Sequence, residues 1–254
     1  MMLSEALLKE KDRVVAFVGG GGKTSLMYRL AREIAARGER VVVTTTTHIM
    51  APNDNDVQSL ILSEDRKLIM EQLQYHLKSQ NLVAVGSKLV SLEGKMKGIE
   101  PEWVEEIAEL PIPVHVVVEA DGSAGRPFKA PADYEPVIPA ATNLVVPVVG
   151  VDIIGKPFGP DFVHRPERVA AIVDIEYGQP ITPEVVARVM LHPKGTAKGA
   201  PGQARVIPVI NKVDDRSLLE TARDIGRLML DEGATRVVIA RAQFEPPVWE
   251  VIER

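Results

Sequence analysis

The sequence of 254 residues contains no cysteine, no large excess of basic residues and no long apolar run. Without cysteine the chain cannot form disulfides or thiolate metal sites. A net charge of −5 gives no overall basic surface, so no nucleic-acid partner is expected. No apolar run approaches the roughly 18 residues of a membrane span, and residues 1–13 resemble a short amphipathic helix rather than a signal peptide. We therefore expect a cytoplasmic protein that does not contact membranes.

Patterns typical of buried strands alternate with helical patterns along the chain. Valine-rich runs predict seven strands, at residues 14–18, 40–47, 81–86, 114–122, 143–150, 204–212 and 235–242. Helical spacing predicts helices at residues 24–38, 64–78, 101–110, 165–173, 182–191 and 216–231. This alternation favours an α/β fold with a doubly wound, mostly parallel sheet of about seven strands. With no evident linker, residues 1–254 are expected to form a single domain.

The segment VVAFVGGGGKTSLMYRLAREIAARG at residues 14–38 places four glycines between a predicted strand and a predicted helix. The start of a helix carries unpaired N–H groups and a partial positive charge, both of which favour an anion. Glycine lets these N–H groups approach phosphate oxygens, Lys23 adds a cation on an exposed loop, and the Thr24 hydroxyl can ligate Mg²⁺. The first glycine of the usual phosphate-binding pattern is missing, because Phe17 stands there.

These features predict a P-loop NTPase-like three-layer sandwich that binds ATP or GTP with Mg²⁺. The alternative is a flexible glycine turn followed by an accidental Lys-Thr pair. The residues predicted to bind the nucleotide are Gly19, Gly20, Gly21, Gly22, Lys23, Thr24 and Ser25.

Two carboxylates follow the apolar part of the predicted strand at 114–122. Glu119 and Asp121 are two residues apart, so both can point at the same ion. Because P-loop proteins hold Mg²⁺ or its waters with a strand-end carboxylate, Glu119 is predicted as a metal ligand and Asp121 as a proton acceptor or water-orienting group. The alternative is a solvated Asp-Gly turn. Thr46, at the end of the predicted strand 40–47, is another candidate metal ligand, unless it reflects only β-propensity.

A third polar group follows the predicted strand at 204–212. The sequence Asn211-Lys212-Val213-Asp214 matches the Asn-Lys-x-Asp box with which GTPases bind guanine, through the aspartate carboxylate and a lysine that packs over the base. The match predicts that Asn211, Lys212 and Asp214 contact the base. The alternative is a polar turn in which Asp214 or Asp215 caps the next helix.

The segments FVGGGGKTS, TTTTH, VEADGSAGRPFKAPADYEPVIP, VVGVDIIGKPFGPDFVHRPE, LHPKGTAKG and VINKVD together resemble the YqeC family. Its members are described as accessory proteins of selenium-dependent molybdenum hydroxylases, or as selenium cofactor biosynthesis proteins. The resemblance covers nearly the whole chain. It implies a P-loop NTPase-like protein in the maturation of a selenium-containing molybdenum centre, with a molybdenum hydroxylase or its cofactor as partner.

The resemblance also carries functional residues over to this sequence. These are Lys23, Thr24, Glu119, Asp121, Lys129, Glu135, His164, Arg165 and Lys198. Among them, the candidate substrate-binding residues are Lys129, Glu135, His164 and Lys198.

The predicted activity is hydrolysis of a nucleoside triphosphate or transfer of its phosphoryl group. The candidate catalytic residues are Lys23, Glu119, Asp121 and Arg165. Arg165 is included because a cation on a loop can neutralise the charge that develops on the γ-phosphoryl group. Two alternatives stay open: an ATP-dependent small-molecule kinase or ligase whose acceptor binds loop 120–142, and a nucleotide-gated cofactor carrier with little turnover. The sequence does not indicate an oligomeric state.

Overall fold

The structure is a computed structural model that describes residues 1–53, 55–90 and 94–254. One large sheet organises it. The strands of this sheet are β1 (Val14–Gly19), β2 (Arg40–Thr45), β4 (Ser59–Leu62), β5 (Leu82–Gly86), β8 (Val114–Glu119), β10 (Leu144–Gly150), β12 (Arg205–Val206), β13 (Val209–Asn211), β14 (Arg236–Ala240) and β15 (Val248–Glu253). They lie in the order β15-β14-β13-β10-β1-β8-β2-β5-β4, with β12 paired to β10. Every pairing is parallel except that of β14 with β15.

Two small sheets lie beside the large one. The strands β3 (His48–Met50), β6 (Lys88–Leu89) and β7 (Lys95–Lys97) pair antiparallel. The strands β9 (Phe128–Lys129) and β11 (Val163–His164) pair parallel, with Lys129 opposite His164. The second small sheet therefore connects loop 120–142 to a distant part of the chain.

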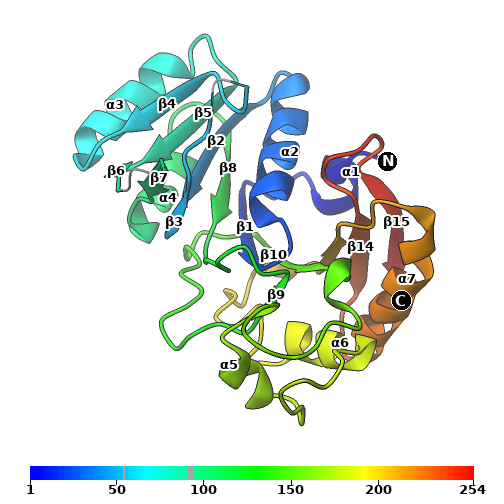
Figure 1. The fold of residues 1–254 in the computed structure, drawn as a ribbon. Coiled ribbons are helices and arrows are strands. Elements are labelled where there is room, and N and C mark those ends of the chain that lie inside the picture. Colours follow the sequence, from blue (N-terminus) through cyan, green and yellow to red (C-terminus); the bar gives the residue numbers. More distant parts are fainter. Residues whose placement is uncertain (54, 91–93) are drawn as a thin grey trace.

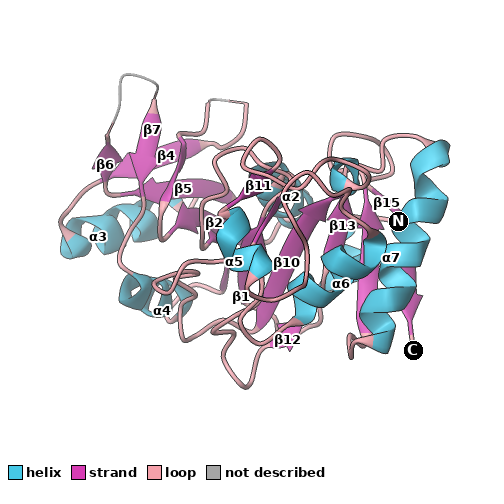
Figure 2. Ribbon diagram, turned by 60° about the horizontal axis from the view of Figure 1, so that its bottom comes forward, coloured by secondary structure: helices cyan, strands magenta, loops and turns pink. Residues whose placement is uncertain are grey.

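Helices cover both faces of the large sheet. They are α1 (Leu3–Leu7), α2 (Lys23–Ala36), α3 (Arg66–His76), α4 (Pro101–Ala108), α5 (Pro166–Ala170), α6 (Pro183–Leu191) and α7 (Leu219–Asp231), with short 3₁₀ helices η1 (Val151–Ile153) and η2 (Arg216–Leu218). Alternation along β1 sends Val15 and Phe17 into the core beneath α1 and α2, whereas Val14 packs on the opposite face with α3 and α4. The helices α6 and α7 cover that opposite face over β10, β13 and β14 (Figure 2).

The predicted mixed α/β fold with a mostly parallel sheet is confirmed, and the predicted number of strands is wrong. The large sheet has ten strands instead of seven among the described residues. The additional strands β4 and β15 lie at the two edges, where one side has no strand neighbour and the apolar pattern is weaker. The predicted strand 204–212 is divided at Pro208 into β12 and β13, because proline cannot donate to a ladder. The single-domain organisation stays a prediction.

The parallel strands bring their carboxyl ends to one edge of the sheet. The loop of Gly19–Gly22 joins β1 to α2 at this edge, and β8 and β10 are the strands on either side of β1 (Figure 1). Polar residues that follow separate strands therefore meet there. No helix in residues 1–53, 55–90 and 94–254 combines the length and apolar character needed to cross a bilayer.

Candidate functional site

The glycine loop, residues 19–22, is packed too closely for any other residue type. A Cβ on Gly21 would lie 2.0 Å from the backbone nitrogen of Gly150, and one on Gly20 would lie 2.6 Å from the carbonyl oxygen of Arg126. Gly19, Gly21 and Gly22 also have positive φ angles, which side chains rarely permit. The close approach of β10 and loop 120–142 thus requires glycine at positions 19–21, whereas Gly22 is required by its positive φ angle.

The first three glycine N–H groups are used within the protein. Gly19 donates to both carboxylate oxygens of Asp121 at 3.0 Å, Gly20 to the Val148 carbonyl at 3.0 Å, and Gly21 to the Arg126 carbonyl at 3.2 Å. By contrast, the part of the chain that the structure describes offers no acceptor to the N–H groups of residues 22–25. These four groups open α2, a helix of 14 residues, and so form a site of positive potential.

Lys23 is buried, so the expectation that its side chain is exposed is wrong. Its exposed fraction is 3%, and its Nζ donates to the Gly19 carbonyl at 2.7 Å. The same Nζ lies 3.4 Å from both Glu119 and Asp121. Burial alone would lower the pKa of Lys23, but the carboxylates of Asp121 and Glu119 together raise the pKa above its usual value. The lysine is therefore held cationic at the base of the glycine loop.

The structure brings two of the three candidate metal ligands together. The hydroxyl of Thr24 donates to Oε2 of Glu119 at 2.7 Å, and burial raises the pKa of Glu119. The hydroxyl of Thr46 instead donates to the carbonyl of Val137 at 2.7 Å, so it holds loop 120–142. Thr24 and Glu119 thus form an oxygen pair beside the glycine loop.

Buried opposite charges continue from the glycine loop into loop 120–142. Lys129 is 1% exposed, and its Nζ lies 3.0 Å from Asp121 and 2.8 Å from Glu135. Glu135 in turn pairs with the guanidinium of Arg165 through both carboxylate oxygens. We call Lys23, Asp121, Lys129, Glu135 and Arg165 the charged chain. It ties the phosphate-binding candidates to the segment before α5.

The other two predicted substrate-binding residues lie outside the charged chain. Lys198 donates to the carbonyls of Ala132 at 2.6 Å and Asp133 at 3.1 Å, and so fastens loop 120–142. His164 is half-buried beside Arg165, and burial lowers its pKa, with the neighbouring cations adding to the effect. The two residues therefore border the same loop without joining its ion pairs.

The Asn-Lys-x-Asp segment meets the glycine loop through its asparagine. The side chain of Asn211 donates to the Gly21 carbonyl at 2.9 Å and accepts from the N–H of Ala242 at 3.2 Å. Lys212 pairs with Asp152 at 2.7 Å, and Asp214 is exposed. The alternative role, in which an aspartate caps the next helix, is present at Asp215. Its carboxylate accepts the backbone N–H of Ser217 at the start of η2. Asn211 thus joins the glycine loop to the end of β14.

Tyr28 is a candidate that sequence reasoning missed. It lines a cleft of about 430 Å³ together with Thr24, Ser25, Ala242 and Gln243. Its hydroxyl is buried and has no partner among the described residues, and burial, aided by the Asp56 and Glu119 carboxylates, raises its pKa. Tyr28 lies one turn after Thr24, so the i, i+4 spacing could have indicated a shared face.

The ion pairs of Glu135 lead to a pH prediction. Burial alone would raise the pKa of Glu135, but Arg165 and Lys129 outweigh it and hold the pKa below the usual 4.5. The unfolded carboxyl therefore binds protons at higher pH than the folded one. The stabilisation is complete above pH 4.5 and is lost as the pH falls through the lower folded pKa.

We therefore expect the wild type to lose more stability than Glu135→Gln when the pH falls from about 5 to about 3. The measurement is urea unfolding of both proteins across this range. If the free energy of unfolding of both proteins fell by the same amount over this pH range, the prediction would be contradicted.

Fold and site together define an α/β protein with a glycine loop and a largely buried charged chain at the carboxyl edge of a mostly parallel sheet. A family model described as "YqeC protein" matches residues 15–167, which is more than half of the sequence. The chain belongs to the YqeC family, as its motifs predict. It is also similar to "Uncharacterized protein YqeC" of Escherichia coli (strain K12), with 29% identity over 204 residues that cover 80% of this chain and 77% of the relative.

The family match includes part of the site and leaves part outside. Residues 15–167 contain the glycine loop, both strand-end carboxylates and the whole charged chain. The segment Asn211–Asp214 and the end of β14 follow the matched region. The charged chain is therefore a feature of the matched part of the sequence, whereas the candidate base contacts lie beyond it.

Proposed function

We propose that the chain is a P-loop NTPase-like protein that binds the phosphates of a nucleoside triphosphate at the start of α2. The observation that carries the proposal is the set of unused N–H groups at residues 22–25, beside the cationic Lys23. Such a helix start favours phosphate oxygens through hydrogen bonds and the helix dipole. The unpartnered hydroxyl of Tyr28 in the adjoining cleft is a second, independent indication of a polar ligand.

The cleft next to α2 offers space for the nucleoside. Its lining extends from Thr24 and Ser25 to Ala242 and Gln243, which follow β14. A volume of about 430 Å³ is within the range of small-molecule sites. Since Asn211 bonds to Ala242, the candidate base contacts border the same region.

Thr24 and Glu119 would hold Mg²⁺ together with the nucleotide. They offer a hydroxyl and a carboxylate oxygen, which are donors that suit a hard cation. The described residues contain no cluster of three or more His, Asp or Glu side chains suited to a metal. This agrees with the usual mode of Mg²⁺, which takes one or two protein ligands and completes its shell with phosphate and water. When bound, the ion would neutralise charge on the phosphate oxygens.

The charged residues support phosphoryl chemistry with distinct roles. The Lys23 ammonium already pairs with the carboxylates of Glu119 and Asp121. A phosphate bound at the start of α2 would therefore compete with these two carboxylates for Lys23. Asp121 accepts the Gly19 N–H and pairs with Lys129, so we assign it to positioning the glycine loop. Arg165 must leave Glu135 before it can reach a phosphate.

The reaction we favour is hydrolysis or phosphoryl transfer in the maturation of a selenium-dependent molybdenum hydroxylase cofactor, a role supported by the family resemblance alone. A small-molecule kinase or ligase and a nucleotide-gated carrier are the alternatives. Identification of the reaction products distinguishes these three activities. Free phosphate indicates hydrolysis, a phosphorylated acceptor indicates a kinase, and stoichiometric binding without turnover indicates a carrier.

Thermal unfolding with and without nucleotide tests the binding proposal. A ligand at 100 times its Kd that binds only the folded state adds about 2.7 kcal/mol of stability, or roughly 5–10 °C in Tm for a chain of this size. We expect this rise with Mg²⁺ and a nucleoside triphosphate, and no comparable rise with Mg²⁺ alone. An unchanged Tm with both ATP and GTP at millimolar concentration would overturn the proposal.

Asp214→Asn tests the base. If Asp214 accepts two hydrogen bonds from guanine, GTP binds more tightly than ATP by about 1.5–3 kcal/mol for each bond kept. The variant should then lose affinity for GTP and gain affinity for XTP, as competition binding would measure. Preference of the wild type for ATP would exclude the guanine contact while leaving the phosphate site intact.

A further inference from the structure

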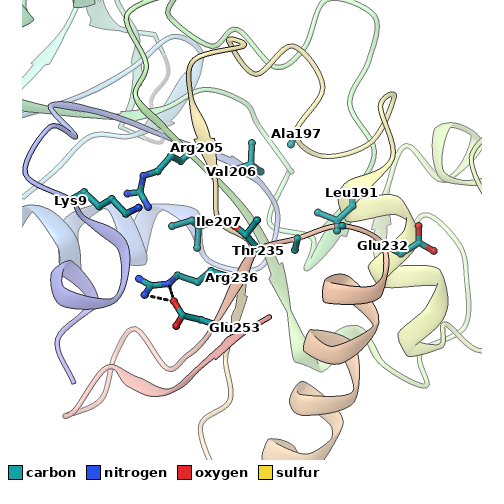
Figure 3. A pocket seen from close by; sticks show the side chains of 12 residues that line it. Lys9, Leu191, Ala197, Arg205, Val206, Ile207, Glu232, Thr235, Arg236 and Glu253 are labelled. Carbon is teal, nitrogen blue, oxygen red and sulfur yellow. Dashed lines mark hydrogen bonds and ion pairs between the residues drawn. The ribbon is translucent and has the colours of Figure 1, made fainter.

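A second pocket lies where the parallel strands of the large sheet begin, whereas the glycine loop lies where they end. Its volume is about 660 Å³, and its walls come from the start of β12, the start of β14, the end of α7 and the segment after α1 (Figure 3). This volume suits a small-molecule ligand. Nothing in the proposed nucleotide chemistry uses this pocket.

The pocket exists because the sheet divides at Pro208. Arg205 and Ile207 donate to carbonyls on the β10 side, so alternation turns the N–H and C=O of Val206 away from β10. On the other wall, the Val238 N–H donates to the Pro208 carbonyl. Arg236 lies two residues before Val238 in β14, so its backbone N–H and C=O point to the same side of the strand. Among the described strands β12 pairs with β10 and not with β14. Both walls therefore offer backbone donors and acceptors to an occupant.

One end of the pocket is cationic. Figure 3 shows the side chains of Lys9 and Arg205 pointing toward each other there. Within residues 1–53, 55–90 and 94–254 the Lys9 ammonium has no partner, and the buried Nε of Arg205 has no acceptor. Arg205 is held in place by the Leu7 carbonyl at 2.7 Å and by Asp12. Arg205 thus forms an ion pair with Asp12, whereas the exposed Lys9 ammonium retains donors that a ligand or water can use.

The rest of the pocket is mainly apolar. Ile207 and Ala234 are buried beneath it, and Leu191 at the end of α6 forms a further wall. The third cation, Arg236, already pairs with Glu253 (Figure 3). The pocket therefore combines an apolar body with one end at which Lys9 is an unpaired cation, and the Glu232 carboxylate lies away from that end (Figure 3).

We propose that this pocket binds a small organic monoanion with an apolar body, whose acidic group lies between Lys9 and Arg205. The apolar body packs on Ile207, Ala234 and Leu191. A polar group on the body can pair with the free backbone edges of Val206 and Arg236. The site is separate from the proposed nucleotide site and does not depend on it.

The test uses 8-anilinonaphthalene-1-sulfonate, an amphipathic anion whose fluorescence rises in apolar surroundings. We expect one saturable site in the full chain. 1-Naphthoate should displace the probe, whereas the neutral 1-naphthalenemethanol, inorganic phosphate and Mg²⁺–nucleotide should not. Lys9→Ala should weaken binding about tenfold, which is the value of one charge-assisted hydrogen bond. Thr235→Trp, at an exposed position in the pocket wall, should abolish it.

Lys11→Ala is the matched control, because Lys11 is exposed on the same segment and lies outside the pocket lining. It should bind the probe as the wild type does. Absence of saturable binding, equal weakening by Lys9→Ala and Lys11→Ala, wild-type binding by Thr235→Trp, or displacement by nucleotide would each overturn the proposal.

Discussion

Replacement of Lys129 by methionine should lower the free energy of unfolding by about 3–5 kcal/mol, the range measured when one partner of a buried ion pair is removed. The lysine is 1% exposed and lies between Asp121 and Glu135. Methionine nearly preserves the volume, so the loss reports charge rather than a cavity. Without the ammonium, two carboxylates face each other in a site with little water. Asp121 also holds the N–H of Gly19, so the disturbance reaches the glycine loop.

Urea unfolding at neutral pH measures this loss. Lys194→Met is the control, because Lys194 is an exposed lysine in the neighbouring segment and its replacement should cost less than about 0.5 kcal/mol. A loss below about 1 kcal/mol for Lys129→Met would show that the buried charges are solvated or neutralised in another way.

The second large effect is expected for Lys23→Ala, which should weaken Mg²⁺–nucleotide binding by about 10- to 100-fold. This corresponds to the loss of one hydrogen bond from a charged donor to phosphate. Because Lys23 also pairs with Glu119 and Asp121 in a buried site, the variant should be less stable than the wild type even without nucleotide. Its effects on fold and on binding must therefore be measured separately.

Calorimetric titration at a temperature where circular dichroism shows the variant folded separates the two effects. Lys11→Ala, an exposed lysine at the opposite edge of the sheet, should retain wild-type affinity. Should Lys23→Ala bind nucleotide as tightly as the wild type, the phosphate would have to lie away from the glycine loop.

Local sequence was sufficient for features that depend on neighbouring residues. The valine-rich runs predicted the central strands, which are buried on both faces. Helical spacing predicted a helix at residues 182–191, and α6 begins there with the Thr182 hydroxyl accepting the Val185 N–H. The order of strand, glycines, Lys-Thr and helix also predicted the glycine loop at the end of β1.

Long-range contacts decided the rest, because no local pattern encodes them. Whether Lys23 is exposed depends on carboxylates about a hundred positions away, and the pair of Glu135 with Arg165 joins residues 30 positions apart. The edge strands β4 and β15 form because each pairs with a buried neighbouring strand, β5 and β14 respectively. Their own apolar patterns are weak. The sequence by itself thus determined the fold class and the glycine loop. Only the tertiary structure assembled the charged chain and opened the second pocket where the sheet divides at Pro208, since both require segments that meet only after folding.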